Sequence, residues 1–256
     1  MLEKERLIKE IDGVINWIRE YVESSHAKGV VVGNSGGKDS ATVLALASKA
    51  LGKDRVLAIG MPCNSIPQDL DDAQLVANAF GVRMIEINLT NPYDLYEQTL
   101  IDSLDNNDIE LIDESKVNIK PRLRMITLYA VAQSLGYLVI GTGNLCEAMV
   151  GYTTKWGDNA SDFNPLGNFT VDEVRFIGSY LGVPDKVIHK APADGLGRQT
   201  DEEKLGVTYK QIEEYIETGK TDPEAMAIIK DKYERTRHKR SLVPVYKVER
   251  INYLEK

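Results

Sequence analysis

The run from Gly33 to Ser40, GNSGGKDS, is the part of this sequence best suited to chemistry on a phosphate group. Its two adjacent glycines let backbone N–H groups approach an anion without interference from a Cβ atom. The hydroxyls of Ser35 and Ser40 can donate hydrogen bonds to phosphate oxygens, and Lys38 adds a positive charge. The carboxylate of Asp39 would repel a phosphate unless a cation such as Mg²⁺ lay between them. The run therefore indicates a site for a phosphate together with a metal ion.

The flanking residues predict that this run connects a buried strand to a helix. Residues 29–33 read GVVVG, a β-branched segment typical of a buried parallel strand, while residues 41–52 are rich in helix formers and end at a glycine. A Walker A loop is excluded, because Val32 stands where its first glycine belongs and Asp39 stands where its Ser or Thr belongs. A turn that only connects strand to helix would explain the glycines but not the serines and the aspartate beside them.

Strands and helices alternate along the rest of the chain, which predicts an α/β fold. Further strands are expected at 55–61, 82–87 and 137–140, and helices at 1–22, 67–80, 121–135, near 170–181 and near 208–217. This order predicts a three-layer sandwich with a mainly parallel sheet and helices on both faces, formed by residues 1–256 as a single domain. Pro121 is predicted to open a helix, residues 92–118 to form short helices or a surface excursion, and residues 151–168 a loop.

Composition narrows the function classes. The 256 residues carry 31 basic and 39 acidic side chains, a net charge of −8, which argues against broad binding to a nucleic-acid backbone. No run approaches the ~18 apolar residues of a membrane span, and the N-terminus lacks the apolar core of a signal peptide. The two cysteines, Cys63 and Cys146, form no C-x-x-C pair, which excludes a disulfide framework and a cysteine-based zinc site. We expect a cytoplasmic enzyme.

The S-G-G-x-D-S pattern after a strand resembles the signature of the PP-loop ATP pyrophosphatases, whose sheet is Rossmann-like, of the adenine nucleotide alpha hydrolase type. Further segments resemble the ammonia-dependent NAD synthetases within that superfamily: NIKPRLRM (118–125), GTGNLCE (141–147), GYTTKWGD (151–158), SDFNPLGNFT (161–170), YLGVP (180–184), GRQTDEEKLGVTY (197–209) and HKR (238–240). This resemblance implies that ATP adenylates the nicotinate carboxylate of deamido-NAD, and that ammonia then displaces AMP to give NAD.

The resemblance also implies roles for individual residues. ATP would contact Thr142 and the phosphate loop, that is Gly33, Asn34, Ser35, Gly36, Gly37, Lys38, Asp39 and Ser40. Asp39 and Glu147 would hold Mg²⁺ and, with Lys38, act in catalysis. The contacts to deamido-NAD would come from Arg122, Lys155, Asp162, His238 and Lys239.

Three positions depart from the family pattern. Val171 stands where a lysine usually contacts ATP, and Ala193 stands where a Ser or Thr is usual. Lys38 stands where a neutral residue is more common, so we hypothesise that it supplies the cation that Val171 cannot.

The resemblance further predicts a homodimer, because such enzymes are built partly on N-terminal helices and the apolar stripe of residues 1–22 is larger than a monomer needs. Free ammonia is the expected nitrogen donor, since no glutaminase signature is visible. Two other functions stay open. One is a tRNA-modifying or sulfurase-like PP-loop enzyme, which the acidic balance and the lack of paired cysteines disfavour. The other is a non-catalytic adenine-nucleotide-binding protein, which has no need of a second metal carboxylate. We expect neither nucleic acid nor a membrane as a partner.

Overall fold

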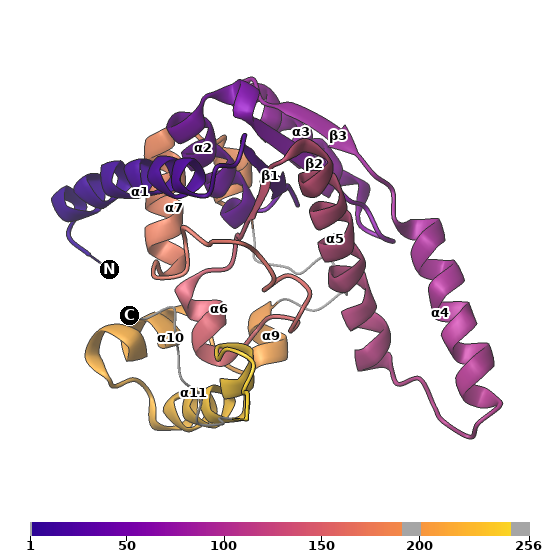
Figure 1. Ribbon diagram of the computed structural model, residues 1–256. Helices are drawn as coiled ribbons and strands as arrows, with labels where there is room; N and C mark the ends of the chain where they lie inside the picture. Colours follow the sequence, from indigo (N-terminus) through magenta and orange to yellow (C-terminus); the bar gives the residue numbers. More distant parts are fainter. Residues whose placement is uncertain (1, 191–200, 247–256) are drawn as a thin grey trace.

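A parallel sheet of four strands lies between helices in the upper part of the computed structural model as drawn in Figure 1, and the structure describes residues 2–190 and 201–246. The strands are β1 (Val30–Gly33), β2 (Val56–Gly60), β3 (Arg83–Glu86) and β4 (Leu138–Ile140), in the order β3-β2-β1-β4. Val31 of β1 is in register with Leu57 of β2 and with Val139 of β4. The four expected strands and the parallel α/β fold are confirmed.

Alternate residues of β1 point to opposite faces of the sheet, and each face is covered by helices. Val30 and Val32 belong to an apolar cluster formed with α1 (Lys4–Ser24), α2 (Lys38–Leu51), α3 (Pro67–Phe80) and α7 (Val171–Leu181). Val31 belongs to a second cluster with α4 (Thr90–Asp105) and α5 (Asp113–Leu135). The fold is therefore the expected three-layer arrangement, with the sheet in the middle.

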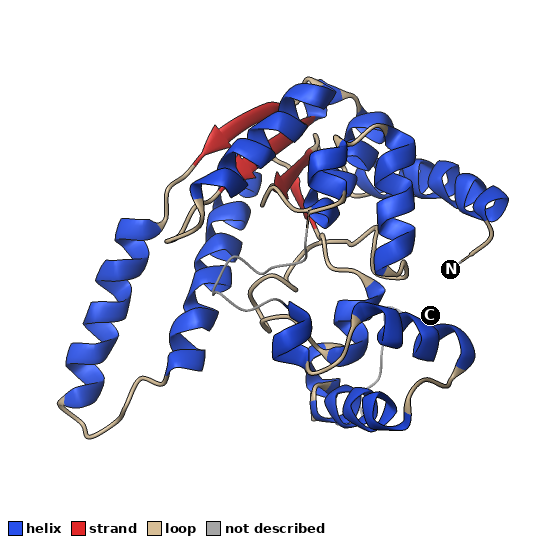
Figure 2. Ribbon diagram, turned by 180° about the vertical axis from the view of Figure 1, so that it is seen from behind, coloured by secondary structure: helices blue, strands red, loops and turns tan. Residues whose placement is uncertain are grey.

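Helices α4 and α5 form an antiparallel pair that extends well beyond the sheet, a feature that we call the arm (Figure 2). The sequence indicated only short helices or a surface excursion at 92–118, whereas α4 is a 16-residue helix. The prediction that Pro121 opens a helix is wrong, because α5 begins at Asp113 and continues through the proline. A proline removes one helical hydrogen bond. Packing of Ile119 and Leu123 against the second cluster offsets that loss.

The C-terminal part of the described chain forms a third apolar cluster around Cys146, Ile212 and Ile229. The elements that contribute to it are α6 (Leu145–Val150), α9 (Asp201–Leu205), α10 (Tyr209–Thr218) and α11 (Pro223–Arg235). Shorter elements are α8 (Asp185–Ile188) and two 3₁₀ turns, η1 (Lys53–Arg55) and η2 (Arg237–Lys239). The helices expected near 170–181 and 208–217 are confirmed, as is the loop at 151–168. Over the described residues, no helix has both the length and the apolar character that a membrane crossing requires.

Candidate active site

A cavity of about 1510 Å³ opens at the carboxyl ends of the strands. Gly33, Gly60 and Ile140, the last residues of β1, β2 and β4, all line it. Ligands of open parallel sheets bind at this edge, next to the point where the strand order reverses, which here lies between β1 and β4. The loop from Gly33 to Ser40 lines the cavity at every position except Gly36, so the structure places the predicted phosphate loop at the expected edge.

Hydrogen bonds between its two serines hold the phosphate loop in a tight turn. The Ser40 hydroxyl accepts the Ser35 N–H at 3.2 Å and donates to the Gly37 carbonyl at 3.1 Å. The Gly37 N–H in turn donates to the Ser35 hydroxyl at 3.3 Å. Gly37 is the N-cap of α2 and carries no side chain that could cap the helix. The first N–H groups of α2 are therefore left for a bound anion, which the helix dipole also favours.

The back of the phosphate loop lies directly against the first turns of α3. The Asn34 side chain donates to the Ala73 carbonyl at 2.8 Å. Gly36 has a φ of +75°, and a Cβ atom there would lie 2.2 Å from the carbonyl oxygen of Asp69. Glycine is required at this position both by the left-handed backbone and by the close approach of α3.

Replacing Gly36 with alanine is expected to destabilise the protein by at least about 2 kcal/mol and to weaken ATP binding, because the new methyl group must displace the loop or α3. Gly219→Ala is the matched control. Its φ is +71°, yet nothing lies within 4 Å of the added Cβ. Urea denaturation and calorimetric titration with ATP check both effects. Equal losses in the two variants would mean that backbone strain alone matters and that contact with α3 does not.

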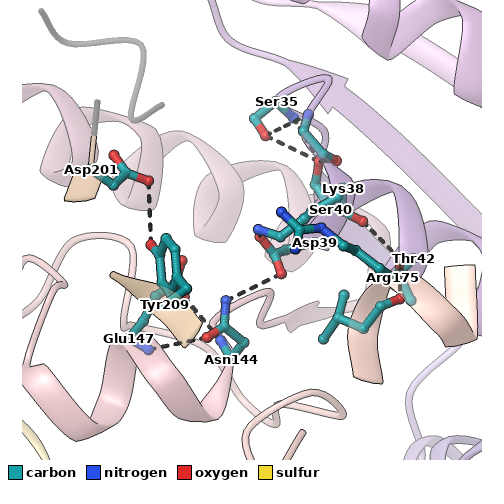
Figure 3. Close-up of polar contacts among 12 residues, drawn as sticks. Ser35, Lys38, Asp39, Ser40, Thr42, Asn144, Glu147, Arg175, Asp201 and Tyr209 are labelled. Carbon is teal, nitrogen blue, oxygen red and sulfur yellow. Dashed lines mark hydrogen bonds and ion pairs between the residues drawn. The ribbon is translucent and has the colours of Figure 1, made fainter. Parts of the chain in front are cut away.

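Asn144 connects the two predicted metal carboxylates, Asp39 at the start of α2 and Glu147 in the first turn of α6 (Figure 3). Its side-chain amide donates to Asp39 Oδ1 at 3.2 Å, and its backbone N–H donates to Glu147 Oε2 at 2.9 Å. Its side-chain oxygen accepts the Glu147 N–H at 3.1 Å, which completes a capping box. Burial and the neighbouring charge of Asp39 raise the pKa of Glu147 to about 8.

This pair of carboxylates suits a hard divalent cation that is also bound by phosphate oxygens. Two acidic groups that repel one another at one end of a cavity gain from a cation placed between them. Mg²⁺ in proteins typically takes one or two carboxylates and fills its other positions with water and substrate phosphates. Within residues 2–190 and 201–246 no cluster of three or more His, Cys, Asp or Glu side chains suited to a metal ion occurs. The donor set therefore fits a metal that arrives with a nucleotide.

Lys38 is buried in the phosphate loop, with only 7% of its side chain exposed. Its ammonium lies 2.7 Å from Asp39 Oδ2. Burial alone would lower the pKa of Lys38, but the charges of Asp39 and Glu147 outweigh it and raise that pKa, so the side chain stays charged. Val171, where the family pattern has a lysine, is fully buried beside Cys146 in the third apolar cluster. Ala193, the other departure, lies outside the described residues.

Of the five residues expected to contact deamido-NAD, one lines the cavity and four do not. Lys239 lines the cavity, as do Thr142 and Glu147, and its ammonium donates to the carbonyls of Gly151 and Thr153 at 2.8 and 2.6 Å. The other four residues do not line this cavity. Arg122 donates to the Lys155 carbonyl at 3.4 Å, and the Lys155 ammonium lies 5.4 Å from the centre of the Trp156 ring. Asp162 accepts the Val139 N–H at 2.7 Å. His238 is exposed.

Three residues of the cavity wall were not singled out from the sequence. Asn144 had a usable signal, because N-x-x-E before a helix is a capping-box pattern. Asp201 accepts hydrogen bonds from Tyr152 at 3.0 Å and from Tyr209 at 3.3 Å, and this contact between distant segments has no local signature. Asp158 lies in the loop beside Lys155, and burial raises the pKa of its carboxyl group.

Comparison with known proteins gives a consistent result. Residues 10–246 match the family model described as NAD synthase. The chain is 43% identical over 239 residues to the NH(3)-dependent NAD(+) synthetase of Carboxydothermus hydrogenoformans, covering 93% of this chain and 96% of that protein. The structure is similar to that of an NMN synthetase from Francisella tularensis, with 32% identity, a TM-score of 0.87 and coverage of 94% of this chain and 99% of that one. It is also similar to an NH3-dependent NAD synthetase from Campylobacter jejuni, with 28% identity, a TM-score of 0.73 and the same coverage. The chain therefore belongs to the NAD synthase family.

Proposed function

We propose that this protein catalyses the ATP-dependent amidation of deamido-NAD with ammonia, giving NAD, AMP and pyrophosphate. It is a ligase that forms a carbon–nitrogen bond. The observation that carries the proposal is the meeting, in one cavity, of the phosphate loop with Asp39 and Glu147 in a chain of this family. A tRNA-modifying or sulfurase-like function and a passive nucleotide-binding function are not favoured by these similarities.

The reaction begins with attack of the nicotinate carboxylate on the α-phosphate of ATP, which releases pyrophosphate. The free N–H groups at the N-terminus of α2 and the loop hydroxyls would bind that pyrophosphate. Asp39 and Glu147 would hold Mg²⁺, which offsets the charge of the phosphates when it is bound. Ammonia then attacks the carbonyl carbon of the acyl-adenylate and expels AMP. No protein nucleophile takes part, so positioning and charge screening supply the catalysis.

The second substrate would be recognised through cationic and polar side chains. Lys239 lines the cavity and is a proposed contact to the dinucleotide there. Arg122 of α5 donates to the Lys155 carbonyl, and neither residue lines the cavity. They remain proposed contacts, together with Asp162 and His238, for a part of the substrate that extends beyond the cavity.

An assay with deamido-NAD, ATP, Mg²⁺ and ammonium tests the proposal. NAD, AMP and pyrophosphate should appear in equal amounts, and their formation should stop when ammonium is omitted. Production of only ADP and orthophosphate by the folded protein would overturn the proposal, because it would place bond cleavage between the β- and γ-phosphates.

Amidation of nicotinic acid mononucleotide is a second candidate. The NMN synthetase from Francisella tularensis superposes on this chain more closely than the Campylobacter NAD synthetase does. Both substrates would present the same nicotinate carboxylate to ATP, so the site described above serves either. The ratio of kcat/KM for the dinucleotide and the mononucleotide decides between them, and a ratio well below one would favour the mononucleotide.

We further propose that the protein is a cytoplasmic homodimer. The argument from the apolar stripe of α1 does not hold, because Leu7, Ile11 and Ile18 are buried inside the chain. The arm instead exposes large apolar side chains, namely Leu95, Tyr96, Ile109, Ile112 and Ile126. A projecting element that exposes several large apolar side chains is a candidate protein–protein interface.

Leu95→Glu is expected to shift a dimer toward monomer at micromolar concentration, because 72% of this side chain is exposed on the arm and a dimer interface there would bury it. Light scattering measures the mass. Leu242→Glu is the control, since Leu242 is even more exposed but lies near the C-terminus, far along the chain from the arm. A wild-type protein that is monomeric at all concentrations would contradict the homodimer.

A further inference from the structure

The Lys38 ammonium has two possible anionic partners. One is Asp39, a proposed metal ligand, and the other is a phosphate of a bound nucleotide. Lys38 is the first residue of α2 and lines the cavity. Both oxygens of the adjacent Asp39 carboxylate are engaged in this structure. The Lys38 ammonium lies 2.7 Å from Oδ2, and the Asn144 amide donates to Oδ1 at 3.2 Å. Each oxygen keeps a further lone pair, but the positive charge beside Oδ2 opposes a metal ion at this carboxylate, so Asp39 binds a cation better once the ammonium moves away.

Groups from three other helices, α6, α7 and α10, surround the Lys38 ammonium. Glu147 of α6 adds a second negative charge to the neighbourhood, and Arg175 of α7 adds a positive one that is already paired with Asp172 at 2.8 Å. The Tyr209 ring of α10 lies 5.9 Å from the ammonium (Figure 3). A lysine ammonium is a point charge on a flexible four-carbon stem, so it can exchange one anionic partner for another nearby.

We propose that Lys38 is a built-in cation of the phosphate site, which holds Asp39 while the site is empty and transfers to the phosphate oxygens of a bound nucleotide. Two consequences follow. Nucleotide binds without a divalent metal, because the ammonium and the N-terminus of α2 offset part of its charge. Asp39 becomes a good metal ligand only after the nucleotide has drawn the ammonium away, so metal binding follows nucleotide binding. The inference deepens the proposed function, because it concerns the same ATP site.

Two binding measurements on Lys38→Gln test the inference, and they are expected to change in opposite directions. Calorimetric titration with ATP in the presence of EDTA should show affinity at least about tenfold weaker than that of wild type, since one charge-assisted contact is lost. Titration of the nucleotide-free variant with Mn²⁺, followed by electron paramagnetic resonance, should show affinity at least about tenfold tighter, because Asp39 is released. Lys38→Arg should stay close to wild type in the ATP titration.

Lys190→Gln is the matched control, because Lys190 also lines the cavity but pairs with Asp69 and Asp72 instead of Asp39. It should leave the affinity of Asp39 for Mn²⁺ unchanged, because the ion pair of Lys38 with Asp39 is intact. Unchanged or weaker Mn²⁺ binding by Lys38→Gln would overturn the inference, as would unchanged ATP binding in EDTA. Neither measurement depends on product formation, so a failure of the amidation assay and a failure of this inference are distinguishable.

Discussion

Replacing Glu147 with glutamine is expected to lower kcat/KM for ATP by about 10²- to 10³-fold while it makes the nucleotide-free protein more stable. Activity falls because one of the two carboxylates that would hold the cation beside the departing pyrophosphate is lost. The fold is kept, because the glutamine side chain still has an oxygen that can accept the Asn144 N–H and complete the cap of α6. Steady-state kinetics at saturating Mg²⁺ measures the first effect.

The gain in stability has a definite pH dependence. Burial and the charge of Asp39 raise the pKa of Glu147 from 4.5 to about 8. Between these two values the unfolded chain loses the proton more readily than the folded chain, so wild-type stability falls as the pH rises from 4.5 to 8. The glutamine variant does not share this loss. Its advantage in Tm should grow from pH 5 to pH 8 and level off above that.

Calorimetric melting in EDTA at pH 5, 6, 7 and 8 measures this trend. Addition of Mg²⁺ and ATP supplies the control, because bound cation and nucleotide should stabilise wild type more than Glu147→Gln and so remove the advantage. A difference in Tm that is the same at every pH would contradict the argument, since it would mean that the ionisation of Glu147 is not responsible.

The strands and the phosphate loop could be predicted from the sequence because their signals are local. The run of valines before Gly33 and the helix formers after Ser40 each indicate one conformation. The length of α5 could not be predicted in this way. Pro121 is a local signal for a helix start, and burial of Ile119 in the second cluster, a tertiary effect, outweighs it.

In the candidate site, too, some features have a local sequence signal and others depend on the tertiary structure. Asp39 and Glu147 could be named from motifs, but their connection through Asn144 depends on where β4 lies beside β1. The ion pair of Lys38 with Asp39 could not be predicted from their adjacency in the sequence, because residues i and i+1 of a helix do not normally face each other. Arg122 and Lys155 are expected from the resemblance alone to contact deamido-NAD, and neither lines the cavity.

Replacing Asp72 with alanine is expected to lower the free energy of unfolding by about 2 kcal/mol. Only 2% of this side chain is exposed, and its carboxylate accepts hydrogen bonds from Lys186 at 2.6 Å and from Lys190 at 2.8 Å. Removing one partner of a fully buried ion pair costs more, about 3–5 kcal/mol. Here the cost is smaller, because the two lysine side chains are 58% and 31% exposed and water can solvate them in the variant.

The pH dependence of this effect is opposite to that of Glu147. Burial alone would raise the pKa of Asp72, but hydrogen bonds and charge from Lys186 and Lys190 outweigh it and lower that pKa below 3.8. The stability that Asp72 contributes is therefore fully present above pH 4 and is lost as the pH falls through its folded-state pKa. The difference between wild type and Asp72→Ala should stay constant from pH 5 to pH 8 and shrink only in acid.

Asp71→Ala is the control that distinguishes the effect of losing this ion pair from the effect of losing a negative charge on α3. Asp71 is the adjacent residue of the same helix, but it is exposed, so its replacement should change stability by no more than about 0.5 kcal/mol. Because α3 supports the phosphate loop through Asn34, Asp72→Ala should also weaken ATP binding, whereas Asp71→Ala should not. Urea denaturation and calorimetric titration with ATP measure the two effects. Equal behaviour of the two variants would mean that the lysine contacts of Asp72 neither stabilise α3 nor position the loop in front of it.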